Sequence, residues 1–215
     1  MIWDSNPWKL DLWRRAHRLA QLKGRAEWSE RDGWALERDA FLGMFTIRRL
    51  LEAHKLSNRI TELRLPARSW PRRAGGRMTY LNWDRIEEFF DFDAEDGSPK
   101  PMRVRELTNQ LIHSYIFSSL SLDGEELMIA FASHRTRLAV LRALDMDLLV
   151  GLYRLVAMDD VAHVTAHYDD AVQDFRVEVG APLLDSELER QLLGDDSIRR
   201  LLVASEVVIN IGGSI

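Results

Sequence analysis

Arg105, Asn109 and His113 occupy every fourth position of a single segment of the chain. An α-helix turns about 100° per residue, so residues spaced in this way share one face of a helix. A histidine side chain can transfer a proton near neutral pH, an asparagine can orient a phosphate or a hydroxyl group, and an arginine can balance phosphate charge. If the segment is helical, these residue types suit the cleavage of a phosphodiester bond in RNA.

The segment that holds them, residues 102–118, has the pattern of an amphipathic helix. Pro101 precedes it, and proline is tolerated at the start of a helix but not inside one. The apolar residues that we expect to face the core are Val104, Leu107, Leu111 and Tyr115. They point away from the polar face, so the three polar residues are available to line a site. The alternative is an ordinary histidine that is solvated or hydrogen-bonded on a polar helix face.

The hexapeptide Thr108-Asn109-Gln110-Leu111-Ile112-His113, preceded by long helices, resembles the Arg-Asn-x-x-x-His motif of HEPN domains. The resemblance covers residues 8–118 and carries over only Asn109 and His113. It implies a helical, often dimeric protein; many members of the family are ribonucleases of toxin–antitoxin or phage-defence systems, and others are non-catalytic. Thr108 stands where the motif has arginine. Either Arg105, one turn earlier, takes the role of that arginine, or the site lacks activity.

A second candidate is the arginine-rich segment of residues 64–77, which also contains two prolines and two glycines. This composition predicts an irregular, exposed and mobile loop. Guanidinium groups pair with phosphates and a tryptophan can stack on a base, as in loops that bind single-stranded nucleic acid. The candidate nucleic-acid-binding residues are Arg68, Trp70, Arg72, Arg73 and Arg77. Alternatively, the arginines pair with the acidic stretch of residues 91–96.

Asp160, His163 and His167 are residue types that bind zinc or manganese. Residues 161–168 alternate in character, however, and this alternation predicts a strand. On a strand, positions four apart lie about 13 Å from one another, which is too far for one ion. We therefore predict no metal site. The chain has no cysteine, no Walker phosphate loop and no Rossmann glycine motif, so no cofactor is predicted either.

Hydrophobic periodicity changes along the chain and predicts an α+β fold. The first half, residues 1–120, is predicted to be a helical bundle with helices over 8–23, 29–55 and 102–118. The second half, residues 121–215, is predicted to form a small antiparallel sheet with helices. Its expected elements are strands 127–132 and 138–144, a helix over 145–158, a hairpin of 161–168 with 175–179, and helices over 185–193 and 197–204. At 215 residues the two halves fit a single domain.

Composition limits the classes of function. The net charge of −5 argues against a uniformly basic nucleic-acid-binding protein, although a local basic surface is compatible with it. The sequence shows neither a secretory signal nor an apolar run of about 20 residues that would cross a bilayer. We therefore expect a cytoplasmic protein without a membrane partner.

Two classes of function agree with these observations. One is a HEPN-like, RNA-directed protein, either an endoribonuclease or a degenerate relative. The other is a non-catalytic homodimer in which the same helix forms the interface through Ile112, Ile116 and Phe117. A basic, partly open cleft around His113 would favour RNA, and a dry apolar contact would favour assembly.

Overall fold

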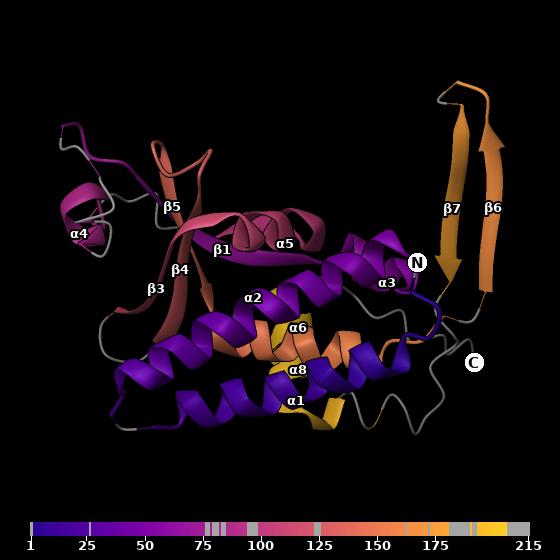
Figure 1. The fold of residues 1–215 in the computed structure, drawn as a ribbon, viewed down its shortest axis with the longest axis horizontal. Helices are drawn as coiled ribbons and strands as arrows, with labels where there is room; N and C mark the ends of the chain where they lie inside the picture. Colours follow the sequence, from indigo (N-terminus) through magenta and orange to yellow (C-terminus); the bar gives the residue numbers. More distant parts are fainter. Residues whose placement is uncertain are drawn as a thin grey trace.

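The computed structural model of the chain describes residues 2–25, 27–75, 78, 82, 85–93, 99–122, 126–161, 163–171, 173–180, 190 and 193–205. They form the α+β fold that the sequence predicts (Figure 1). A layer of helices packs beside a five-stranded antiparallel sheet, and a two-stranded hairpin projects from the body at the other end of the helices. None of the helices in these ranges is long and apolar enough to span a membrane.

The helical layer is built on two long antiparallel helices, α1 (Asn6–Lys23) and α2 (Glu30–Glu52). Helix α2 begins with a capping box, in which the Asp32 carboxylate accepts a hydrogen bond from the Ser29 backbone N–H over 3.0 Å. Behind this pair lie α6 (Met146–Met158) and α8 (Asp196–Ala204) (Figure 1). These four helices agree with the helices predicted from the periodicity of the sequence.

The five-stranded sheet has the order β2-β1-β5-β4-β3, and neighbouring strands in its described part are antiparallel. Its strands are β1 (Arg64–Pro71), β2 (Lys100–Arg103), β3 (Ser114–Leu122), β4 (Glu126–Ser133) and β5 (Val140–Asp145). One sheet face packs on the helices through Ile129, Phe131 and Leu144. The opposite face forms a second core with Phe89 and Phe90, at and next to the short helix α4 (Ile86–Phe89). The sheet therefore joins two hydrophobic cores.

Strand β1 corrects the prediction of an irregular, exposed loop over residues 64–77. Residues 64–67 pair with β2 and residues 68–71 pair with β5, so each half of the strand has one unpaired edge in the described part of the sheet. Proline lacks an N–H group and is tolerated at such an edge, which explains why Pro66 and Pro71 do not interrupt the strand. Leu65, Ala67 and Trp70 on this strand are buried.

The predicted helix over residues 102–118 is wrong at both ends. Helix α5 spans only Val104–Ile112, between β2 and β3. Residues from Ser114 onward pair with β4 instead. Aromatic and β-branched side chains such as Tyr115, Ile116 and Phe117 fit a pleated surface well, and this pairing outweighs the helical spacing of the apolar residues. The first half of the chain is consequently not a helical bundle, because it contributes three strands to the sheet.

The remaining elements of the second half follow the prediction closely. Strands β4 and β5 match the two predicted apolar runs, and the hairpin consists of β6 (His163–Asp169) and β7 (Asp174–Gly180). A short helix, α3 (Asn58–Glu62), contacts the base of this hairpin through Asn58, whose side-chain oxygen accepts a hydrogen bond from the Val179 N–H. Most of the predicted helix over 185–193 lies outside the described residues.

Candidate anion-binding cleft

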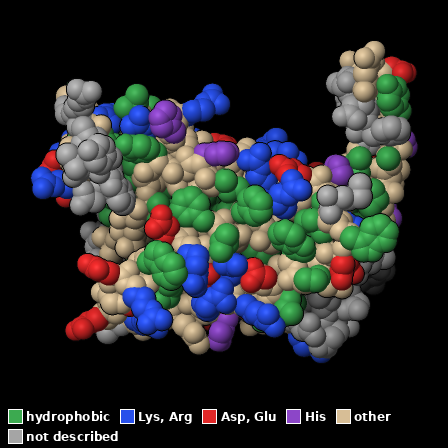
Figure 2. Space-filling model, in the orientation of Figure 1, with side chains coloured by type: hydrophobic (Ala, Val, Ile, Leu, Met, Phe, Trp, Pro, Cys, Tyr) green, Lys and Arg blue, Asp and Glu red, His purple; other side chains and the backbone are tan. Residues whose placement is uncertain are grey.

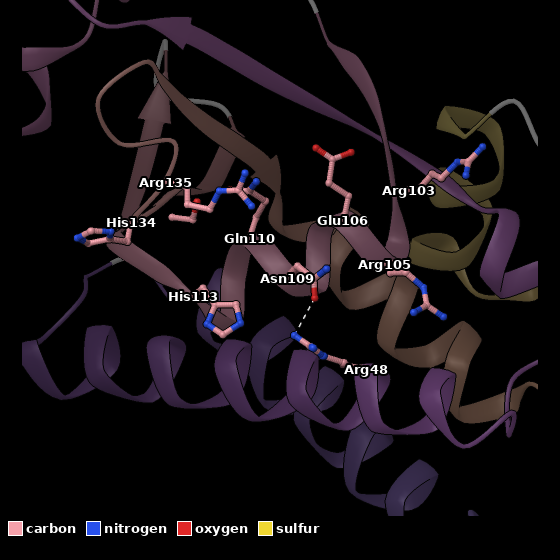
Figure 3. A pocket seen from close by; sticks show the side chains of 10 residues that line it. Arg48, Arg103, Arg105, Glu106, Asn109, Gln110, His113, His134 and Arg135 are labelled. Atoms are coloured by element: carbon pink, nitrogen blue, oxygen red, sulfur yellow. Dashed lines mark hydrogen bonds between the residues drawn. The ribbon is translucent and has the colours of Figure 1, made fainter. Parts of the chain in front are cut away.

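A cleft of about 690 Å³ lies beside α5, and four separate parts of the chain form its walls. Helix α2 contributes Arg48, the end of β2 contributes Arg103, and the turn between β4 and β5 contributes His134 and Arg135 (Figure 3). Ser133 at the end of β4 also lines the cleft, and the rest of the wall belongs to α5 and the residue that follows it. Segments distant in sequence therefore meet around Arg105, Asn109 and His113, the candidate residues for RNA cleavage.

Arg105, Asn109 and His113 all line this cleft, and all three are exposed to solvent. Val104, Leu107 and Leu111 are buried in the core on the opposite side of α5. His113 is the first residue after the helix, and its N–H donates to the Asn109 carbonyl over 3.2 Å. Although α5 is shorter than predicted, the helical spacing persists as far as His113 and keeps these residues on one side.

Arg48 orients Asn109. Its Nη1 donates a hydrogen bond to Asn109 Oδ1 over 2.8 Å, drawn in Figure 3, and its Nε donates to Glu52 over 2.9 Å. The hydrogen bond from Arg48 is the main reason that the pKa of Glu52 lies below its ordinary value, so Glu52 stays ionised and holds the arginine. With its carbonyl oxygen occupied, Asn109 presents its NH₂ group as a donor to the cleft.

The turn between β4 and β5 is fastened to the end of α5. The His134 N–H donates to the His113 carbonyl over 3.2 Å, and Thr136 Oγ1 donates to Gln110 Oε1 over 3.2 Å. The turn itself is closed by Thr136 Oγ1, which accepts a hydrogen bond from the Ser133 N–H over 3.0 Å. A second histidine is thereby held at the cleft, although in Figure 3 its ring points away from that of His113.

The charges around the cleft are mainly positive. Four arginines line it, Arg48, Arg103, Arg105 and Arg135, whereas Glu106 is the one acidic residue among the described lining residues. Glu106 already accepts a hydrogen bond of 2.6 Å from Arg142, which neutralises it. The guanidinium groups of Arg103, Arg105 and Arg135 make no hydrogen bond or ion pair with any residue that the structure describes. The cleft therefore has several cationic donors available for an anion.

The sequence did not identify the contributions of Arg48, Arg103, His134 and Arg135. A sequence signal existed for the last two, because residues 133–136 separate two predicted strands and so must form a turn. Only the pairing of β3 with β4 shows that this turn meets α5, since β3 begins where α5 ends. For Arg48, nothing in the spacing of α2 indicates that it lies against Asn109.

The predicted nucleic-acid-binding arginine segment is not part of this cleft. Trp70 is only 2% exposed and packs against Phe92 with ring centroids 5.0 Å apart, so the expectation that it stacks on a base is wrong. Burial of an indole in a sheet core outweighs its exposure on a loop. Arg68 lies half-buried on β1, and Arg77 lies outside the described residues.

The other two candidate arginines of that segment, Arg72 and Arg73, have partners within the protein. Arg73 lies 3.5 Å from Asp91 and 3.6 Å from Asp93, in agreement with the alternative that these arginines pair with the acidic stretch. Arg72 donates to the Arg137 carbonyl over 3.2 Å and stacks over the Phe89 ring. Both side chains therefore support the local structure around α4.

His163 and His167 lie on β6 as exposed residues of an extended strand. Within the described ranges, no three histidine, aspartate or glutamate side chains gather in a way that could hold a metal ion.

The fold and this cleft define an α+β protein with a basic cleft beside a central helix. Comparisons with models of known protein families, with curated proteins and with solved structures found no match. The ligand of the cleft must therefore be inferred from the residues that line it.

Proposed function

We propose that the protein is an RNA-directed protein that binds RNA in the cleft beside α5 and cleaves it with His113 as the proton acceptor. One observation carries this proposal: three arginines without partners among the described residues line the same cleft as an exposed histidine and an oriented asparagine amide. Guanidinium groups bind phosphate oxygens in a bidentate manner, and the amide adds a neutral donor.

The extent of the cleft favours a polymer over a single small phosphate. Arg105 and His113 are eight residues apart along α5, which corresponds to about 12 Å of helix. Arg135 lies on the β4–β5 turn, at the His113 end of this line. Cationic groups are thus distributed along the cleft and not focused on one point, as a polyanionic backbone requires.

The chemistry available to His113 explains the choice of RNA over DNA. A neutral imidazole can accept the proton of a ribose 2′-hydroxyl while the 2′-oxygen attacks the adjacent phosphorus. The new bond joins the 2′-oxygen to phosphorus, the bond from phosphorus to the 5′-oxygen breaks, and the leaving oxygen takes a proton from solvent. The products are a 2′,3′-cyclic phosphate and a 5′-hydroxyl. Arginines along the cleft would offset the negative charge that develops on the phosphoryl oxygens.

The resemblance to HEPN ribonucleases supports the same assignment through Asn109 and His113. At the position of the motif's arginine, Thr108 is fully buried and its hydroxyl donates to the Arg105 carbonyl over 2.9 Å, so it cannot contact a ligand in the cleft. Arg105 is exposed and lines the cleft. Of the two alternatives for that arginine, the proposal adopts substitution by Arg105 from one turn earlier.

The proposal does not adopt the alternative of a homodimer interface through Ile112, Ile116 and Phe117, because these side chains already pack within one chain. Ile116 is fully buried in the second core, and Phe117 packs against Phe41 with ring centroids 5.4 Å apart. Ile112 is partly buried against the main core. These side chains serve the core of one subunit, because β3 replaces the C-terminal half of the predicted helix.

Binding of a single-stranded RNA oligonucleotide, measured at a series of salt concentrations, tests the proposal. A plot of log affinity against log salt has a negative slope, and each single-strand phosphate contact makes it steeper by about 0.7. Replacing Arg103, Arg105 and Arg135 together with alanine should therefore make this slope shallower by about 2. The matched control replaces three arginines outside the cleft, Arg14, Arg31 and Arg199. Equal losses in both triple variants would contradict binding in the cleft, as would an unchanged slope in the cleft variant.

A further inference from the structure

The hairpin of β6 and β7 is an unusual feature because it stands apart from the five-stranded sheet. In Figure 1 it projects from the end of the molecule, with β7 toward the body and β6 on the outer side. In the part of the chain that the structure describes, β6 pairs with β7 alone. A two-stranded ribbon is only marginally stable in water, and three or more strands with a hydrophobic face are generally needed.

The hairpin has two chemically different faces. Val164, Ala166 and Tyr168 alternate along one face of β6, with Val164 opposite Val179 and Ala166 opposite Val177. Although apolar in character, Val164 is 56% exposed and Tyr168 is 55% exposed, and hydrophobic side chains are visible on the projecting hairpin in Figure 2. The other face of β6 carries His163, Thr165 and His167. Among the described residues, β6 is therefore an amphipathic strand whose outer edge has no pairing strand.

We propose that this outer edge of β6 pairs with β6 of a second copy of the chain, antiparallel and around a two-fold axis through Ala166. A two-fold axis perpendicular to the sheet leaves each side chain on the same face of the sheet in both copies. Directly opposed residues of antiparallel strands also share a face, so the axis must lie at a residue and not between two residues. Centred on Ala166, the middle of the seven-residue strand, the pairing includes every residue of β6. The two hairpins then form one four-stranded sheet in the order β7-β6-β6-β7.

Complementary side chains on opposite ends of β6 select this register and this partner. With Ala166 on the axis, His163 lies opposite Asp169 of the second copy at both ends of the strand. Moving the axis to Thr165 would place His163 opposite His167, and no residue of β6 would lie opposite Asp169. An imidazole N–H can donate a hydrogen bond to a carboxylate, and polar pairs of this kind across antiparallel strands stabilise the pairing. The strand is thus complementary to its own reversed sequence, which a second copy of the chain supplies.

The same register also joins the apolar faces. Val164 of one copy lies opposite Tyr168 of the other, and the two Ala166 side chains meet on the axis. An aromatic residue opposite a β-branched one is a favourable cross-strand pair. Pairing also satisfies the row of backbone groups on the β6 edge that otherwise face solvent. This inference concerns a surface distant from the α5 cleft and does not depend on RNA binding.

Disulfide trapping tests the register directly, because the chain has no cysteine of its own. Directly opposed residues of antiparallel strands have Cα atoms about 4.5 to 5.5 Å apart, within the range that a disulfide spans. Ala166→Cys should therefore give a covalent dimer under mild oxidation. Val164→Cys is the matched control, since its two copies would lie four residues apart along the strands, about 13 Å, and should not cross-link.

Sedimentation equilibrium of the wild-type chain supplies the second measurement. It should show a dimer, and Ala166→Lys should shift the protein to a monomer by placing two like charges together on the axis. Ala166 is exposed in the single chain, so this replacement does not disturb its core. A monomeric wild-type protein would overturn the proposal, as would Val164→Cys cross-linking as readily as Ala166→Cys.

Discussion

Arg48 Nη1 donates to Asn109 Oδ1 over 2.8 Å and joins α2 to α5 at the edge of the basic cleft. The contact links residues 61 positions apart in the sequence. It fixes which end of the Asn109 amide faces the ligand, because the carbonyl oxygen is already bound to the guanidinium. A neutral donor is thereby held among the arginines that we propose to bind RNA.

Asn109→Asp should weaken RNA binding while leaving the fold intact. The carboxylate would keep the contact with Arg48 but lose the NH₂ donor and add a negative charge to the cleft. A repulsion of about 1 kcal/mol corresponds to roughly a fivefold loss of affinity. Titration of labelled RNA measures the effect, with Gln21→Glu on α1 as a control that adds the same charge outside the cleft. Equal affinities for the two variants would remove Asn109 from the binding site.

Gly43 and Gly33 of α2 should respond oppositely to replacement by alanine. A Cβ atom at Gly43 would overlap the ring of Tyr153, which is fully buried and donates to the Ala40 carbonyl over 2.8 Å. Overpacking of this kind costs about 1 to 3 kcal/mol of unfolding free energy. No described atom lies within 4 Å of a Cβ at Gly33, so Gly33→Ala should stabilise the protein by about 0.5 to 1 kcal/mol. Urea unfolding of both variants measures these changes. A Gly43→Ala variant as stable as Gly33→Ala would contradict the close contact between Gly43 of α2 and Tyr153 of α6.

Asp39 should make the stability of the protein sensitive to acid. Burial alone would raise the pKa of its carboxyl, but the hydrogen bond from Arg18 and the charges of Arg18, Arg15 and Arg38 hold that pKa below its ordinary value. A lowered pKa in the folded state contributes stability above the unfolded pKa of about 3.9 and loses it as the pH falls toward the folded pKa.

Asp39→Asn should therefore lower the unfolding free energy at neutral pH by about 2 kcal/mol or more, because Arg15, Arg18 and Arg38 lose a buried partner. The difference from the wild type should shrink below about pH 4. Urea unfolding at several pH values measures it, and Asp11→Asn, which affects a more exposed partner of Arg15, serves as the control. A difference that stays constant with pH would show that Asp39 does not titrate in this way.

Local sequence patterns were sufficient for the long helices and for the hairpin. The stripe of Leu36, Ala40, Met44 and Ile47 specifies the buried face of α2, and the alternation from Val164 to Tyr168 specifies β6. The same patterns gave a wrong prediction for residues 114–118, because these residues have both the apolar spacing of a helix and the residue types of a strand. Tyr115 satisfies both patterns, and only the long-range pairing with β4 decides between them.

Only part of the candidate cleft could be predicted from the sequence, because some of its residues come together through long-range packing. Arg105, Asn109 and His113 lie on one short helix, so their spacing predicted that they share a face. Arg48 and Arg135 reach the same cleft through tertiary packing, which spacing along the chain does not encode. For Trp70 the composition of the segment was misleading. A segment rich in arginine, proline and glycine was predicted to be an exposed loop, but residues 64–71 form a strand with alternating buried positions.

Cleavage of an RNA oligonucleotide by the wild-type protein and by His113→Ala is the most direct test of the proposed function. The variant should cleave about 100-fold more slowly or worse, as expected for removal of a general base. Its melting temperature should stay close to that of the wild type, because an exposed substitution usually costs no more than about 0.5 kcal/mol. His167→Ala, an exposed histidine on β6, should cleave normally. An inactive wild-type protein, or a His113→Ala variant that cleaves as fast as the wild type, would contradict the account.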